Sequence, residues 1–198
     1  MTESRVLHIG AEGTLDDVLL FLRRGELVVF PTDTVYGLAA RADEELAVRA
    51  LYSTKGRDPN HKAALLVDGA QALKEAMPSV PPKAMILARK FWPGQLTIVI
   101  REGGVTTGFR CPAHPFALMV AKKKDFPILI TSANRTGDPD PVVFRDVATS
   151  RLNIPPALVI DGGATIFRKP STVVEVEGDT VKMLREGVVS PSRIPFLI

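Results

Sequence analysis

Short runs of β-branched and aliphatic residues alternate along the chain with segments in which apolar residues recur every three or four positions. The short runs are typical of strands buried in a sheet, and the longer spacing is typical of helices that cover it. Gly178-Asp179 separates two of the runs and indicates a hairpin, so the pattern favours a mixed sheet over an all-parallel one. The predicted strands are residues 27–30, 65–67, 96–100, 109–111, 127–131, 158–160, 172–176 and 181–184.

Three segments with helical spacing carry signals for where a helix begins or ends. We expect Asp43 to cap the first and Gly56 to end it, because a carboxylate binds free amides and glycine adopts a left-handed conformation. Pro82 and His114 stand near the starts of the other two, and residues 135–141 are expected to form a loop. The predicted class is α/β, a sheet flanked by helices. The helical segments are residues 43–54, 82–91 and 115–123.

The composition indicates the size and surroundings of this fold. With 198 residues, 45% of them hydrophobic, we expect a single domain over residues 1–198 with its core at about 15–190. Cys111 is the only cysteine, which excludes an internal disulfide and multi-cysteine metal sites and favours a reducing compartment, so a cytoplasmic location is expected. No apolar run approaches the roughly 20 residues of a membrane helix, and the N-terminus lacks a signal-peptide pattern, so no membrane association is expected.

The charge balance changes this picture only slightly. Lys and Arg outnumber Asp and Glu by 25 to 22, and the isoelectric point is about 9.1, which mildly favours anionic partners. The basic run at residues 122–124 is interpreted as the solvated last turn of a helix. The three histidines are scattered at positions 8, 61 and 114, so no metal cluster is predicted.

The most informative polar segment is Thr32-Asp33-Thr34, where a buried strand stops at Pro31 and gives way to hydroxyls and a carboxylate. Proteins of the α/β class commonly place ligand contacts at strand ends. The same residue types are also typical of a turn in which side chains satisfy only neighbouring backbone groups. The local pattern leaves both interpretations open.

Lys55 and Arg57 flank Gly56 after a predicted helix end. Two cations separated by a flexible glycine can clamp phosphate oxygens, although basic residues are also a common way to end a helix. Residues 58–62 prolong this polar stretch, either as a loop that closes over a ligand or as a solvated loop. These alternatives also remain open from local sequence.

Further candidate ligand contacts follow other strands. Ser132 and Asn134 come directly after the strand at 127–131, where they can bind a nucleotide or cap the next element. Arg110 is suited to hold a carboxylate in its guanidinium fork, whereas Cys111 is interpreted as a small buried residue rather than a nucleophile. Walker-type, Rossmann and serine-hydrolase motifs are absent from the sequence. Any ATP must therefore be held by dispersed side chains and strand-end backbone groups.

A series of short strings occurs in a defined order: PTDTVYGLAA, KGRD, FWPGQLT, FRCPAHP, TSANRTG, IDGG, PSTVVEV and LREG. In this order they resemble the YrdC-like family of threonylcarbamoyl-AMP synthases, from about Gly25 to Val188, in its short single-domain form. The resemblance implies a YrdC-like fold, in which a twisted mixed sheet flanked by helices surrounds a deep ligand groove.

The resemblance also implies an activity. The family makes threonylcarbamoyl-AMP and pyrophosphate from L-threonine, bicarbonate and ATP, so the chain is expected to be an L-threonylcarbamoyladenylate synthase, a nucleotidyltransferase. Mg²⁺ is expected to accompany ATP as substrate, and a threonylcarbamoyl transferase complex is the expected partner that modifies tRNA. Weak binding of tRNA or other RNA is a further expectation. The alternative to the synthase is a non-catalytic nucleotide- or RNA-binding module of the same fold.

The family's functional positions can be matched to residues of this chain. Thr34, Arg110 and Ser171 match positions near the threonine. Lys55 and Arg57 are assigned to catalysis, because cations offset the repulsion between a carbamate and a polyphosphate. The family also implies a loop that closes, and KGRDPNHK is the candidate segment. The positions matched around ATP are Lys55, Arg57, Thr106, Ser132, Asn134 and Arg185.

Two departures from the family pattern stand out. Residues 58–62 replace a family segment that often contains Pro followed by Asn-Pro, so no ligand contact is carried over to this loop. Gln95 stands where the family usually has a second proline in a WPGPLT-like string. We expect Gln95 to affect only the local turn.

Overall fold

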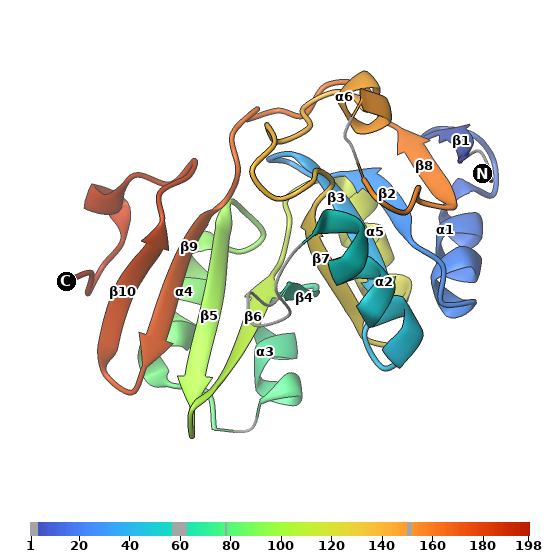
Figure 1. Cartoon of the computed structure of the whole chain (residues 1–198). Coiled ribbons are helices and arrows are strands. Elements are labelled where there is room, and N and C mark those ends of the chain that lie inside the picture. The colour runs from blue at the N-terminus through green and yellow to red at the C-terminus, as the bar shows by residue number, and fades with distance from the viewer. Residues whose placement is uncertain (1–3, 57–62, 78, 150–151) are drawn as a thin grey trace.

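Ten strands form one sheet in the part of the chain that the computed structural model describes, residues 4–56, 63–77, 79–149 and 152–198 (Figure 1). The strands are β1 (Arg5–His8), β2 (Val28–Pro31), β3 (Tyr36–Arg41), β4 (Ala64–Leu66), β5 (Leu96–Glu102), β6 (Val105–Arg110), β7 (Ile128–Ser132), β8 (Leu158–Asp161), β9 (Thr172–Glu177) and β10 (Thr180–Arg185). The helices are α1 (Thr14–Arg23), α2 (Glu45–Lys55), α3 (Ala70–Ala76), α4 (Pro82–Phe91), α5 (Pro115–Lys123), α6 (Phe144–Thr149) and the short 3-10 helix η1 (Pro191–Arg193).

The strands follow the order β1-β8-β2-β3-β7-β4-β6-β5-β9-β10 across the sheet. The pairs β1–β8, β2–β8, β4–β6 and β5–β9 are parallel, and the other neighbouring pairs are antiparallel. The prediction of a mixed sheet flanked by helices is therefore confirmed. The predicted hairpin around Gly178 is also present, as the β9–β10 pair.

Helices pack on both faces of the β8-β2-β3-β7 part of the sheet. Helices α1 and α5 enclose a core with Val28 and Phe30, whereas α2 and α6 enclose a second core with Val29 and Leu38. Neighbouring residues of β2 thus enter different cores, because side chains alternate between the faces of a strand. This two-sided burial explains why β2 has a continuous apolar sequence.

Helices α3 and α4 pack on one face of the β6-β5-β9 part and lie behind these strands in Figure 1. Leu96, Ile98 and Ile100 of β5 alternate into the core with these helices. Thr97 and Val99 therefore point to the opposite face, where they are half-buried. That opposite face borders the pocket described below.

Helix α2 begins later than predicted. Its N-cap is Glu44 rather than Asp43. The Asp43 carboxylate instead binds the Arg41 guanidinium, with 2.6 Å between Nε and Oδ1, so it is turned away from the helix start. Gly56 ends the helix in a left-handed conformation at φ 58°, as predicted. The other two predicted helices have the expected bounds.

Six elements were not predicted, namely β1, α1, β3, α3, α6 and η1, and β6 begins at Val105 rather than near 109. Strand β3 matters most for the site, because it converts the Thr32-Asp33-Thr34 segment into a hairpin turn. Its Gly37 lies where a Cβ atom would come within 2.7 Å of Ile130. No helix in the described ranges is long and apolar enough to cross a membrane.

Candidate functional site

An open pocket with about 820 Å³ of empty space lies where the β2–β3 turn faces β5, β6 and the β9–β10 hairpin. Residues from strands far apart in the sequence line it together. The predicted site residues on its wall are Thr34, Arg110, Ser132, Ser171 and Arg185.

The β2–β3 turn holds its shape through Thr32. The Thr32 hydroxyl donates to the Val35 carbonyl at 2.6 Å and accepts the amides of Thr34 and Val35 at 3.2 and 3.3 Å. The Thr34 hydroxyl lies 3.0 Å from that of Thr32 and lines the pocket. The interpretation as a local turn is therefore confirmed, and the same turn places Thr34 on the pocket wall, where its contact with a ligand stays a prediction.

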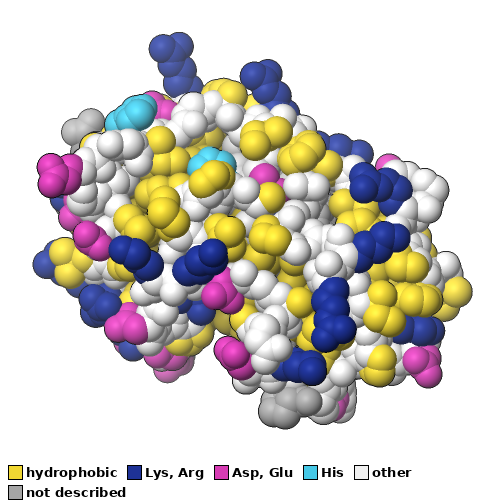
Figure 2. Space-filling view, turned by 180° about the vertical axis from the view of Figure 1, so that it is seen from behind, with side chains coloured by type: hydrophobic (Ala, Val, Ile, Leu, Met, Phe, Trp, Pro, Cys, Tyr) yellow, Lys and Arg dark blue, Asp and Glu magenta, His cyan; other side chains and the backbone are white. Residues whose placement is uncertain are grey.

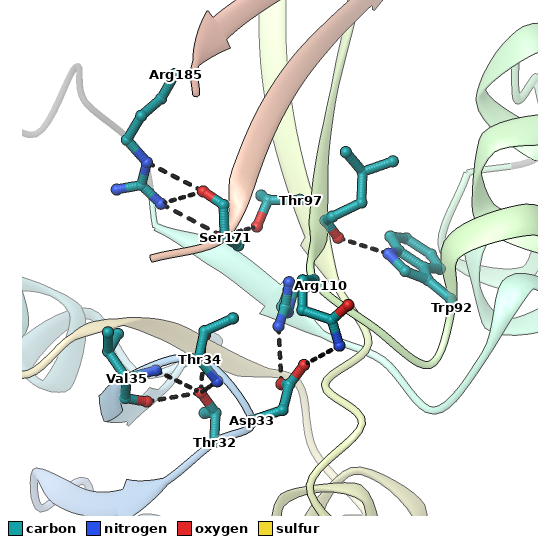
Figure 3. Close-up of polar contacts among 11 residues, drawn as sticks. Thr32, Asp33, Thr34, Val35, Trp92, Thr97, Arg110, Ser171 and Arg185 are labelled. Carbon is teal, nitrogen blue, oxygen red and sulfur yellow. Dashed lines mark hydrogen bonds and ion pairs between the residues drawn. The ribbon is translucent and has the colours of Figure 1, made fainter. Parts of the chain in front are cut away.

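Asp33 and Arg110 form a buried ion pair beneath the pocket (Figure 3). The distance from Arg110 Nη2 to Asp33 Oδ1 is 2.8 Å, and the two side chains are only 7% and 1% exposed. Burial lowers the pKa of Arg110, and the charge of Asp33 opposes this shift. Arg110 Nη1 is buried without a hydrogen-bond partner in the described part of the chain. A pocket-lining guanidinium with an unused donor is a ready site for an anionic group.

The opposite wall comes from β5 and the β9–β10 hairpin. The hydroxyls of Thr97 and Ser171 lie 2.8 Å apart. Arg185 donates from Nε and Nη2 to the Ser171 carbonyl at 3.2 and 2.9 Å, and from Nη2 to the Ser171 hydroxyl at 3.3 Å. Figure 3 shows Arg185, Ser171 and Thr97 on one side of Arg110, and the β2–β3 turn on the other.

Lys55 and Asn134 lie outside the pocket wall and bind each other. The buried Lys55 ammonium donates to the carbonyls of Ser132 and Asn134, the latter at 2.6 Å, and to Asn134 Oδ1 at 3.3 Å. Asn134 Nδ2 donates to the Asp138 carbonyl at 2.6 Å. Lys55 thus fixes the end of β7, which carries the pocket residue Ser132, and the turn that follows it.

Two other predicted ATP-site residues are not on the pocket wall. Thr106 lies on β6, two residues before the pocket residue Gly108, and pairs with Arg101 of β5. Because alternate residues of a strand lie on the same face of the sheet, Thr106 shares a face with Gly108 but lies farther from the pocket. Arg57 and the rest of the candidate closing segment KGRDPNHK, residues 57–62 of 55–62, lie outside the described residues.

Asp33, Gln95 and Thr97 take part in the polar contacts of the site but were not among the predicted site residues. Asp33 stood in the polar strand-end segment, so its residue type was the available signal. Thr97 is the polar member of an alternating strand, which is the signal for the face opposite a core. Gln95 Nε2 donates to Asp33 Oδ2 at 2.8 Å, a contact that the turn prediction did not include.

Cys111 and His114 follow Arg110 but have different surroundings. Cys111 is fully buried, and this burial raises the pKa of its thiol to about 12, which confirms the interpretation as a buried small residue. His114 is the residue just before α5, as predicted. Burial lowers the pKa of its imidazole, with the Asp33 charge opposing the shift.

The site thus offers hydroxyls and guanidinium groups, while its Asp33 carboxylate already has two side-chain donors. Within the described ranges, no group of three His, Cys, Asp or Glu side chains could hold a metal ion. This chemistry suits a ligand with carboxylate or phosphate groups.

Comparison with known proteins gives consistent matches. Residues 20–187 match the model of the Sua5_yciO_yrdC family, which carries the description "Telomere recombination". The threonylcarbamoyl-AMP synthase of Bacillus subtilis is 34% identical over 188 residues, covering 89% of this chain and 54% of that protein. The solved structure of P. abyssi Sua5 complexed with L-threonine superposes with a TM-score of 0.84 at 32% identity, covering 98% of this chain and 60% of that chain.

The chain therefore spans only a little over half the length of these two relatives. The crystal structure of E. coli YciO matches over its whole length, with a TM-score of 0.83, 23% identity and 98% of this chain covered, which shows the same fold. The family match covers most of the chain, including every residue found on the pocket wall. The chain belongs to the Sua5/YciO/YrdC family.

Proposed function

We propose that the chain is an L-threonylcarbamoyladenylate synthase that forms threonylcarbamoyl-AMP and pyrophosphate from L-threonine, bicarbonate and ATP. The names of its relatives support this proposal, as does the L-threonine bound to P. abyssi Sua5. The observation that carries it is the buried Arg110 guanidinium on the pocket wall, whose Nη1 lacks a partner among the described residues. An amino-acid carboxylate supplies the acceptor that this donor requires.

In this proposal the threonine carboxylate binds Arg110, and the hydroxyls of Thr34 and Ser171 orient the rest of the amino acid. The neutral threonine amine takes up bicarbonate with loss of water and becomes a carbamate. A carbamate oxygen then attacks the α-phosphorus of ATP, and the bond from this phosphorus to pyrophosphate breaks. Holding the two reactants in line lowers the barrier, because their encounter no longer costs translational and rotational entropy.

Cations on the other side of the pocket would bind the phosphates. Arg185 lies on the wall, and Ser132 supplies a hydroxyl there. Arg57 and Thr106 are assigned to ATP by their match to the family alone, as is Asn134. The Lys55 ammonium would act in catalysis by fixing the end of β7, which carries Ser132. Mg²⁺ would enter with ATP on its phosphates as part of the substrate, because Mg²⁺ keeps several waters and needs few protein ligands.

The product would pass to a threonylcarbamoyl transferase complex that modifies tRNA, and we place this activity in the cytoplasm, where the single cysteine stays reduced. Direct tRNA binding has less support. Figure 2 shows Lys and Arg side chains lying among acidic and hydrophobic ones over the face turned away from the viewer of Figure 1. A nucleic-acid surface requires clustered cations.

The test is pyrophosphate release measured with ATP and Mg²⁺, with L-threonine or bicarbonate omitted in turn. We expect release only when both are present. Arg110→Met should raise the KM for threonine by at least about tenfold, because the carboxylate loses a charged partner. Lys122→Met, which changes an exposed cation on α5, serves as the control. ATP binding without threonine-dependent release would refute the synthase and support the non-catalytic nucleotide-binding module.

A further inference from the structure

Gln95 reaches across the site to a residue 62 positions away in the sequence. Its Nε2 donates to Asp33 Oδ2 at 2.8 Å, while Arg110 Nη2 donates to Asp33 Oδ1, also at 2.8 Å. Each oxygen of the buried carboxylate therefore has its own side-chain donor. The sequence expectation that Gln95 affects only its local turn was wrong, because its amide is extended toward the β2–β3 turn rather than toward solvent.

The backbone of Gln95 is fixed from the other side. Its carbonyl accepts the Thr172 amide at 3.0 Å, at the start of β9. Thr172 is fully buried and adjoins Ser171 on the pocket wall. Gln95 thus connects the two sides of the site, with its backbone bound to the Ser171 side and its side chain bound to the Asp33 side.

We propose that Gln95 is a positioning residue that sets the affinity of the site for the carboxylate of its amino-acid substrate. Held at both oxygens, the Asp33 carboxylate keeps one orientation, and Arg110 Nη2 stays bound to it. Arg110 Nη1 is then left as a fixed donor for the substrate. Without the Gln95 amide, the Asp33 carboxylate can rotate, so it no longer holds the Arg110 guanidinium in one orientation. Arg110 Nη1 is then no longer preorganised to bind the substrate. This inference rests on the proposed function.

The neutrality of the Gln95 amide is part of the argument. Asp33 already faces the Arg110 guanidinium on β6, and the segment after β6 brings Cys111 and His114 near the carboxylate. The Arg185 charge on β10 also acts on Arg110. A second cation at position 95 would compete with Arg110 for Asp33, and a proline would supply no donor. An amide satisfies the second oxygen and leaves the charge pairing unchanged.

The test measures L-threonine binding by isothermal titration calorimetry and ATP binding in a separate titration. Gln95→Met removes the donor at similar length. We expect threonine to bind roughly tenfold more weakly, as when one hydrogen bond to a charged group is partly lost, with ATP affinity unchanged. Gln71→Met, on the exposed surface of α3, is the control and should leave both affinities unchanged.

Gln95→Glu adds a readout that a purely structural role would not give. Above its pKa the introduced carboxylate repels Asp33, so threonine binding at about pH 8 should be weaker than in the unmodified chain. On protonation at lower pH the introduced group donates a hydrogen bond again, and the affinity should recover. The unmodified chain should show no such recovery.

The outcomes separate the two proposals. If the unmodified chain binds no threonine, both the proposed function and the role of Gln95 fail. If it binds threonine and the Gln95 variants bind equally well at every pH, only the positioning role fails. A parallel loss of threonine and ATP affinity, with no pH recovery in Gln95→Glu, would also overturn the positioning role, because it would reveal general damage to the fold.

Discussion

Asp33→Asn removes one charge from the buried pair beneath the pocket and keeps the shape of the side chain. The Arg110 guanidinium, 7% exposed, is then left without a counter-charge. The new amide can still bind both neighbours, because its oxygen accepts from Arg110 and its NH2 group can donate to the oxygen of a flipped Gln95 amide. The substitution therefore tests how much the free energy of unfolding depends on the charge of Asp33.

Removing one partner of a buried ion pair lowers the free energy of unfolding by about 3–5 kcal/mol. Because the Asp33 and Arg110 side chains are both buried, solvent screens their charges little, and the expected loss in the free energy of unfolding needs little reduction. In a chain of this length each kcal/mol shifts the melting temperature by about 2–4 °C, so Asp33→Asn should melt roughly 6–20 °C below the unmodified chain.

Thermal and urea unfolding followed by circular dichroism measure both quantities. Asp125→Asn is the matched control, because the distance from Arg23 Nη2 to Asp125 Oδ1 is also 2.8 Å while the side chains are 50% and 65% exposed. An exposed ion pair contributes little to the free energy of unfolding, so this control should melt at the same temperature as the unmodified chain. Because the two ion pairs have the same N–O distance, a difference between their melting temperatures can be assigned to burial.

A double variant tests the cause. Arg110→Met combined with Asp33→Asn removes both charges, so it should unfold less readily than Asp33→Asn alone. Equal losses for Asp33→Asn and Asp125→Asn would refute the reasoning from burial. So would a double variant that is less stable than Asp33→Asn, because an unpaired guanidinium would then not be the source of the loss.

Three further outcomes are expected. The Cys111 thiol, with its pKa raised to about 12, should resist a thiol reagent at about pH 8 until urea unfolds the chain. Because burial lowers the pKa of His114, the unfolded state binds more protons just below the ordinary value of 6.5, so stability should fall as pH drops through this window, and less in His114→Gln. Gly187→Ala would place a Cβ 2.3 Å from the Pro170 carbonyl and should cost about 1–3 kcal/mol in urea unfolding, unlike Gly69→Ala, which meets nothing within 4 Å.

Elements with strong local signals could be predicted from the sequence. The strand around Ile98 has strict alternation, and the helices at Pro82 and Pro115 start at prolines, so each has nearly its predicted bounds. Strand β3, with the sequence YGLAAR, lacks β-branched residues. It forms because β2 and β7 provide hydrogen-bond partners on both sides, which a local pattern does not contain.

The site was predictable to a similar degree. The ordered strings indicated the five wall residues, but they could not reveal which cations bind protein atoms instead of facing the pocket. Lys55 is enclosed by carbonyls of the turn after β7, an arrangement that depends on residues 77 and 79 positions away. The Gln95–Asp33 contact likewise depends on the folded chain, because neither residue has a local partner that predicts the other.

The parallel pairing of β5 with β9 has a consequence for how the protein is made. These strands are adjacent in the sheet, yet the loop closed between Thr97 and its neighbour Val173 contains most of the second half of the chain. Such distant pairings form late, because loop-closure entropy must be overcome first. A chain still emerging from the ribosome would carry Arg110 and Asp33 long before Ser171 and Arg185 arrive. The wall of the pocket would then be incomplete until the β9–β10 hairpin has been synthesised and has paired with β5.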